Sequence, residues 1–196
     1  MKRASTRFWL YASAFLFATA AEVVWAQSTA PRAEAISGRS NEVTLARLRP
    51  GRSTFVQVEE LYPTVYWVRR IGTMWLTDPC KGLTMMVDTE LGKEINAIRI
   101  EPTEGSEEEC PENRDWYWGT GDGLKVGDTK TKVYSIYGEP NSVSPSTKNG
   151  QPLELLHYVF DWAGPDVPQV MEVVCTAPKD GTPGRVVEIT LAAGTL

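Results

Sequence analysis

The sequence carries one pattern twice, and this duplication limits the folds open to the chain more than any other feature. A turn with a glycine and a following hydroxyl residue occurs at Gly51 and Thr54 and again at Gly127 and Thr129, with the two glycines 76 positions apart. Each glycine permits a turn with positive φ. Each threonine is placed to cap the exposed amides of a helix. Because internal repeats constrain a fold strongly, we expect two copies of one structural unit.

Each copy opens with a short, one-sided helix. The first follows Thr54, with Gln57 placed to complete a capping box, and Pro63 ends it. The second follows Thr129 and ends at Gly138. The apolar residues at helical spacing are Phe55, Val58, Leu61 and Tyr62 in the first, and Val133, Ile136 and Tyr137 in the second.

After each helix the apolar period changes to two, which is typical of strands. The expected strands are Thr64–Val68, Thr73–Thr77, Leu83–Val87 and Ile95–Ile100, then Ser142–Ser144, Leu155–Asp161, Gln169–Thr176 and Arg185–Ala192. No strand-helix-strand alternation occurs, which argues against a parallel nucleotide-binding sheet. We therefore expect the α+β class: two tandem repeats of a helix and an antiparallel β-meander, with the helices packed on one face of one continuous or two abutting sheets.

The first 26 residues have the pattern of an export signal. Lys2, Arg3 and Arg7 precede an apolar stretch at 8–21, and Ala26 marks the expected cleavage position. The apolar stretch is shorter than the roughly 20 residues that span a bilayer. We therefore expect a periplasmic or secreted protein without membrane insertion of the mature chain. The expected parts are the signal peptide 1–26, a flexible leader 27–44, the repeats 45–103 and 123–196, and an acidic and aromatic linker 104–122.

Composition argues against two classes of function. The chain has 20 Lys and Arg against 25 Asp and Glu, a formal charge of -5. This balance argues against nucleic acid as a partner, because phosphate binding needs a basic surplus. One His and three Cys are too few for a His-rich metal cluster or a four-thiolate zinc site, and we expect no metal and no cofactor. The glycine-rich segment 119–123 has no Lys directly after it and is interpreted as a turn, not a phosphate loop.

His157 is the one imidazole on which a hydrolase could depend. Strand alternation places it on the side of Leu155 and Val159, and we interpret it as a strand residue paired with a carboxylate or a backbone group. A hydrolase using His157 stays as an alternative, although the chain has no Gly-x-Ser-x-Gly segment. Asp78, Asp88 and Asp161 lie at strand ends, where aspartate usually caps turns.

Three cysteines in an exported chain allow one disulfide. A hairpin between the strands at 83–87 and 95–100 brings Cys80 near Cys110, which favours that pair. The alternative pair is Cys110 with Cys175. The apolar strand around Cys175 instead favours a buried free thiol there.

The aromatic residues indicate a binding surface. Trp and Tyr are favoured at protein interfaces, and three consecutive large rings cannot all point inward from one strand. We expect the rings at 116–118 to be the most exposed of the set. The candidate protein-binding residues are Trp116, Tyr117, Trp118, Trp75 and Trp162.

The segments that begin at Gly51 and Gly127 resemble the helix entry of outer-membrane-assembly lipoproteins of the BamE/SmpA type. The resemblance is closest over 127–140, which ends in Gly138, Glu139 and Pro140. Two such units in one exported chain resemble the β-lactamase inhibitor protein-like fold. The resemblance implies a non-catalytic protein-binding module of the bacterial envelope, of the assembly or scaffold type. The alternative is a secreted inhibitor of an exported enzyme that uses the concave sheet face.

Overall fold

The computed structural model describes residues 44–62, 67–70, 72–89, 94–103, 117–160 and 169–194. Its elements in chain order are α1 (Phe55–Leu61), β1 (Trp67–Arg70), β2 (Thr73–Asp78), β3 (Leu83–Asp88), β4 (Ala97–Pro102), α2 (Lys130–Tyr137), β5 (Ser142–Lys148), β6 (Gln151–Phe160), β7 (Gln169–Thr176) and β8 (Val186–Ala193). The expected signal peptide and nearly all of the expected leader lie outside the described residues.

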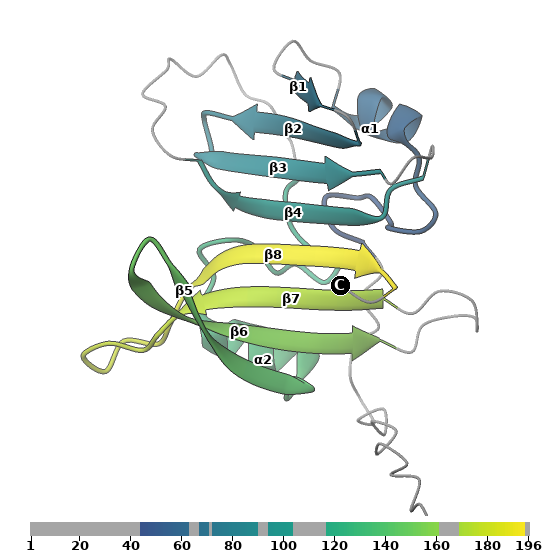
Figure 1. Cartoon of the computed structure of the whole chain (residues 1–196). Helices are drawn as coiled ribbons and strands as arrows, with labels where there is room; N and C mark the ends of the chain where they lie inside the picture. The colour runs from purple at the N-terminus through teal and green to yellow at the C-terminus, as the bar shows by residue number, and fades with distance from the viewer. Residues whose placement is uncertain are drawn as a thin grey trace, which may run out of the picture. The chain divides into compact units, whose positions relative to one another are not determined.

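The eight strands form a single antiparallel sheet in the order β1-β2-β3-β4-β8-β7-β6-β5 (Figure 1). Strands β4 and β8 join the two runs of strands, with Ile98 opposite Leu191 and Ile100 opposite Ile189. Of the two arrangements considered from the sequence, the sheet is therefore the continuous one.

The expected α+β class with tandem helix-and-meander repeats is wrong. The described residues contain two helices, of 7 and 8 residues, against eight strands that share one sheet. Each helix has only about two turns, so the helices cannot form a layer comparable to the sheet. Pairing of β4 with β8 also merges the two strand runs, so the chain does not form separate repeat units. The fold is predominantly antiparallel β.

The local features of the helix entries are confirmed. Thr54 caps α1 and forms the capping box with Gln57, while the Thr129 side chain accepts the Lys132 amide at the start of α2. Gly51 and Gly127 have φ of 77° and 91°. These values lie in the left-handed region that glycine adopts without strain.

The core lies on one face of the sheet, which we call the back face. Two rows of buried side chains cross six strands in register. The rows are Met74, Val87, Ile98, Leu191, Met171 and Tyr158, and Leu76, Met85, Ile100, Ile189, Val173 and Leu156. Val58 of α1, Tyr62 directly after it, and Val133 and Tyr137 of α2 belong to the same core cluster.

Helix α2 lies against the back face of β6. The Tyr137 ring is 5.8 Å from that of Tyr158 and 6.0 Å from that of Phe160. The Lys130 ammonium lies 2.7 Å from the Glu154 carboxylate. Figure 1 views the sheet from the opposite side, with α2 behind β6 and β7. Neither helix among the described residues has the length and apolar character needed to cross a bilayer.

Candidate functional site

The face opposite the core, which we call the front face, carries one row of side chains in register across all eight strands. The row is Val68, Trp75, Met86, Arg99, Thr190, Glu172, His157 and Ser142, in sheet order. Strand alternation gives each of these residues the same side. The row therefore brings side chains from distant parts of the chain onto one side of the sheet, where Thr190 is buried and its neighbours Arg99 and Glu172 are not.

One end of the row is apolar and accessible. Val68 is 58% exposed, and Trp75 and Met86 beside it are half-buried. At the other end, Val159 is 37% exposed on the same side of β6 as His157. Apolar side chains are therefore accessible at both ends of the row.

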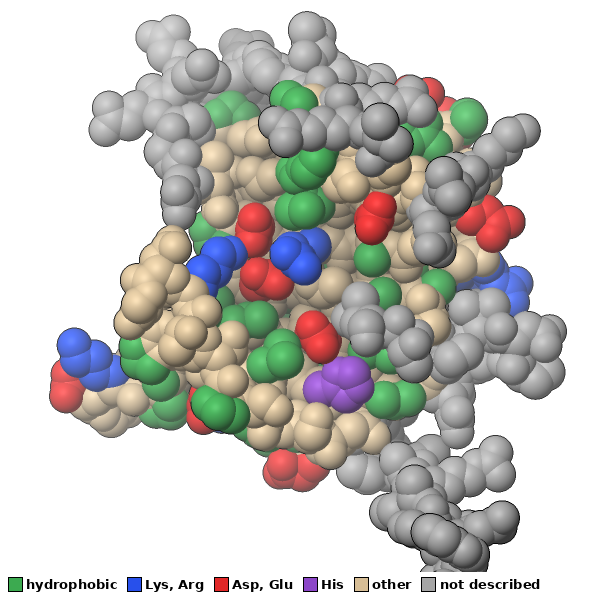
Figure 2. Space-filling model, in the orientation of Figure 1, with side chains coloured by type: hydrophobic (Ala, Val, Ile, Leu, Met, Phe, Trp, Pro, Cys, Tyr) green, Lys and Arg blue, Asp and Glu red, His purple; other side chains and the backbone are tan. Residues whose placement is uncertain are grey.

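The centre of the front face is charged and paired. The Arg99 guanidinium lies 3.4 Å from the Glu188 carboxylate. The Lys148 ammonium lies 2.6 Å from Glu101 and 3.4 Å from Glu188. Figure 2 shows acidic and basic side chains gathered near the middle of this face, with apolar side chains above them. The pKa of Lys148 is raised, mainly because its ammonium donates a hydrogen bond to Glu101. Partial burial lowers this pKa, and the negative charges of Glu101 and Glu188 raise it further.

The contacts of Lys148 show that the sheet bends strongly at this end. In sheet order, β8, β7 and β6 lie between β4, which carries Glu101, and β5, which carries Lys148. An ion pair across that many strands requires the β5–β6 hairpin to curl over the front face. Figure 1 shows the turn of this hairpin at the left, raised to the level of β8.

Replacing Lys148 by glutamine is expected to loosen the β5–β6 hairpin with little loss of global stability. Lys148 is 48% exposed, so solvent screening limits its pairs to no more than about 1 kcal/mol. Hydrogen exchange should show faster exchange of the amides at 146–151, and 0.5 M salt should partly reproduce this effect in the unchanged protein. The control is Lys179→Gln, in an exposed turn. We call the contacts of Lys148 with Glu101 and Glu188 the clasp. Equal amide exchange rates in the two variants would show that the clasp does not hold the hairpin in place.

His157 is paired with a carboxylate, one of the two kinds of partner expected for it from the sequence. Its Nδ1 lies 3.4 Å from Oε1 of Glu172, which is directly opposite it on β7. Ser142 of β5 lies opposite His157 on the other side. The row thus sets Ser142, His157 and Glu172 next to one another on three strands, and these are residue types that a serine hydrolase uses.

The structure places the aromatic candidates in different environments. Trp75 lies on the front face. Trp118 is only 3% exposed and belongs to the core cluster, so its expected exposure is wrong. Tyr117 is partly buried, with Lys125 at 5.1 Å and Arg47 at 6.0 Å from its ring centre. Trp116 and Trp162 lie outside the described residues. Trp75 is thus the described candidate best placed for a partner.

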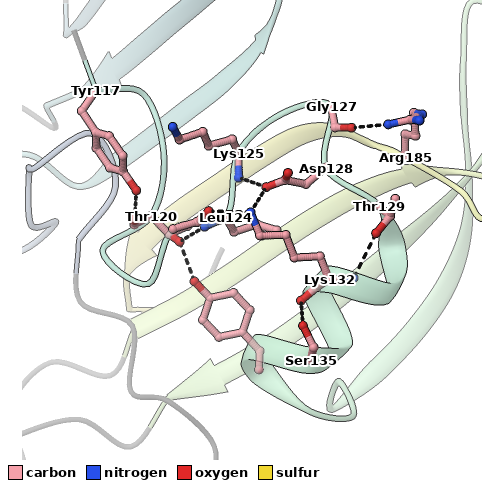
Figure 3. Close-up of polar contacts among 12 residues, drawn as sticks. Tyr117, Thr120, Leu124, Lys125, Gly127, Asp128, Thr129, Lys132, Ser135 and Arg185 are labelled. Carbon is pink, nitrogen blue, oxygen red and sulfur yellow. Dashed lines mark hydrogen bonds and ion pairs between the residues drawn. The ribbon is translucent and has the colours of Figure 1, made fainter. Parts of the chain in front are cut away.

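The segment that leads into α2 is organised around Thr120 (Figure 3). Its hydroxyl oxygen accepts the Leu124 amide at 3.0 Å and the Tyr137 hydroxyl at 2.7 Å, and its carbonyl accepts the Tyr117 hydroxyl at 2.6 Å. Asp128 accepts the Lys125 amide and pairs with Lys132 at 2.8 Å. The structure thus confirms a turn in the segment 119–123.

The helix-entry residues Gly51, Thr54, Gly127 and Thr129 act structurally. Thr54 and Thr129 cap helices, and the Gly127 carbonyl accepts a hydrogen bond from Arg185 at 2.9 Å. Asp78 caps the turn after β2, as expected, because its carboxylate accepts the amides of Cys80 and Lys81.

The cysteines are described in part. Cys175 is a buried free thiol, as expected, and burial raises its pKa to about 11. Cys80 is exposed. Cys110 lies outside the described residues, so the Cys80–Cys110 disulfide stays a prediction. Within the described ranges, no group of three or more His, Cys, Asp or Glu residues is placed to hold a metal ion.

Sequence reasoning missed Met86, Arg99, Glu188, Glu101 and Lys148 as site residues. Alternation within β3 and β4 was a signal that placed Met86 and Arg99 opposite the core. No comparable signal linked Lys148 to Glu101, because their contact depends on the bend of the hairpin.

Comparison with protein-family models, with curated proteins and with solved structures finds no match. The resemblance to BamE/SmpA-type lipoproteins and to the β-lactamase inhibitor protein-like fold therefore stays a prediction from the helix-entry residues.

Proposed function

We propose that this protein is an exported, non-catalytic protein-binding module that docks a protein partner on the front face of its sheet. One observation carries the proposal: Trp75, Met86 and Arg99 lie directly opposite one another on β2, β3 and β4. Tryptophan, methionine and arginine are enriched at protein interfaces. Tryptophan and arginine also dominate the residues that contribute most to binding.

The charges of the front face support a protein partner. Arg99, Lys148, Glu101 and Glu188 form a paired cluster, and the apolar side chains lie beside it. A surface of mixed sign offers no continuous basic track for nucleic acid. It does offer both attraction and selectivity toward a protein surface that carries complementary charges.

Site-specific photo-crosslinking tests this proposal. A photoreactive amino acid is placed at Val68 or Val159 on the front face, and at Thr131 on the exposed side of α2 as the control. In envelope extract, the two front-face positions should give the same partner adduct and Thr131 should give none. Adducts formed only from Thr131 would overturn the front face as the docking surface.

Truncation of the central residues should weaken the same complex. With the partner isolated from the adduct, Trp75→Ala and Arg99→Ala are each expected to lower affinity about tenfold or more, as for central interface residues. Thr131→Ala is the control and should leave affinity unchanged. Isothermal titration calorimetry measures both, and circular dichroism confirms that each variant folds. Unchanged affinity in both front-face variants would contradict the proposal.

The alternative function, a secreted inhibitor of an exported enzyme, would use the same front face. It differs from a scaffold in its effect on the activity of the partner. If the crosslinked partner is an enzyme, stoichiometric addition of this protein should block its activity. A scaffold should leave that activity intact. A hydrolytic activity of this protein that is lost in His157→Ala would overturn the non-catalytic assignment.

A further inference from the structure

A pocket lies under the β5–β6 hairpin, at one end of the front face. It has a volume of about 230 Å³. Its walls come from the end of β4, from the hairpin and from the start of β8. The lining residues are Pro102, Thr103, Lys148, Asn149, Gln151, Leu153 and Val187. Three regions far apart in the sequence therefore build one hollow.

The surface inside the pocket is mainly apolar, and it presents no unpaired charge to an occupant. Leu153 is 5% exposed, although it lies on the same side of β6 as Leu155 and His157. With Val187 and Pro102 it supplies apolar surface. The one charged lining residue, Lys148, is already paired with Glu101 and Glu188. An anion would have to compete with both carboxylates, which favours an uncharged occupant.

The volume of the pocket fits one amino-acid side chain better than a drug-sized ligand. An apolar cavity of about 150 Å³ holds benzene. Pockets for drug-sized ligands have volumes of about 300–1,000 Å³. At about 230 Å³, the pocket has room for the side chain of a leucine, methionine or phenylalanine.

The lining also holds a polar group that suits an occupant belonging to a polypeptide. Gln151 is exposed and carries an amide that can donate to and accept from a peptide backbone, whereas the Thr103 hydroxyl already contacts that of Thr84. A small apolar molecule would make no use of the Gln151 amide. Interfaces commonly seat one buried anchor residue in such a pocket, inside a polar rim.

We propose that this pocket is the anchor site of the front face and that it takes one uncharged apolar side chain from a loop of the protein partner. The inference rests on the proposed function, because it names the chemistry that the partner must present. Lys148 holds the hairpin wall in place through Glu101 and Glu188, so the clasp also maintains the pocket.

Model compounds test the chemistry of the pocket without the partner. The protein is labelled at its Leu and Val methyl groups and titrated with N-acetyl-leucinamide, N-acetyl-phenylalaninamide or N-acetyl-lysinamide. The methyl signals of Leu153 and Val187 should shift saturably with the leucine or phenylalanine amide. The lysine amide should bind at least tenfold more weakly. Equal binding of the lysine amide, or no shift at these methyl groups, would overturn the proposal.

A variant that fills the pocket tests whether the methyl shifts come from binding inside it. Gln151→Trp places a large ring at the pocket, whereas Thr147→Trp adds the same ring on the exposed hairpin at a position outside the pocket lining. The first should abolish the shifts caused by N-acetyl-leucinamide, and the second should preserve them. Both residues are exposed, so the fold should tolerate either change. Shifts that survive Gln151→Trp would contradict binding in the pocket.

The two proposals fail separately. Crosslinking from Val68 and Val159 could capture the partner while the model amides leave the methyl signals of Leu153 and Val187 unchanged. That result would support the front face as the docking surface and contradict the pocket as the anchor site. If both hold, Gln151→Trp should weaken the complex with the isolated partner about tenfold or more, and Thr147→Trp should not. Unchanged affinity in Gln151→Trp would overturn the anchor role even if the amides bind.

Discussion

Replacing Leu191 by alanine is expected to lower the free energy of unfolding by about 3–4 kcal/mol, the cost of a large cavity in a packed core. Leu191 is fully buried. It lies on β8 between Ile98 of β4 and Met171 of β7, at the centre of a row of buried side chains. The cavity would open where the two runs of strands join, so the neighbouring backbone has little freedom to fill it.

Urea denaturation monitored by tryptophan fluorescence measures this loss. The matched control is Leu61→Ala, because Leu61 is 38% exposed at the end of α1. The control should cost less than about 1 kcal/mol, since the side chain is already partly in water. If Leu191→Ala costs no more than Leu61→Ala, then the β4–β8 junction is not part of a close-packed core.

Replacing Gly184 by alanine is expected to cost about 3 kcal/mol or more, or to prevent folding. A Cβ atom at this position would collide with the backbone carbonyl oxygen of Thr176. Gly184 is buried, and its own carbonyl accepts the Lys130 amide at 2.7 Å, at the start of α2. On the next residue, the Arg185 amide donates to the Thr176 hydroxyl at 2.9 Å. Relief of the collision would require the end of β7 or the start of β8 to move, which breaks these bonds.

The same denaturation experiment tests Gly184→Ala, and circular dichroism shows whether the variant folds. Thr182→Ala is the control, because Thr182 is exposed in the neighbouring turn. That change should stay within about 0.5 kcal/mol of the unchanged protein. A folded Gly184→Ala variant that loses less than about 1 kcal/mol would contradict the close approach of these two segments.

Several features of the fold were predictable because their causes are local. The capping box of Thr54 and Gln57 needs only residues three positions apart. Most described strands begin and end within a few residues of the expected bounds, since alternation of apolar residues marks a half-buried strand directly. For His157 the sequence left two kinds of partner open, a carboxylate and a backbone group, and the structure has a carboxylate.

The candidate site was predictable only in part. Residue type predicts an interface position for Trp75, and the structure places it on the front face. Residue type predicts the same for Trp118, which is buried in the core. The type of a residue cannot separate these two cases, because both rings are equally suited to a core or an interface. Met86 and Arg99 gain their significance from being opposite Trp75, and that depends on strand register.

The sequence by itself determined where the helices begin and end and where most strands lie. These features depend on caps, turns and periodicity within about ten residues. Tertiary structure alone decided the β4–β8 pairing that makes one sheet, the predominance of β over α structure, the burial of Trp118 and the clasp of Lys148 on Glu101 and Glu188. Each of these depends on contacts between residues far apart in the chain, whose free energies exceed local preferences only once the whole core has formed.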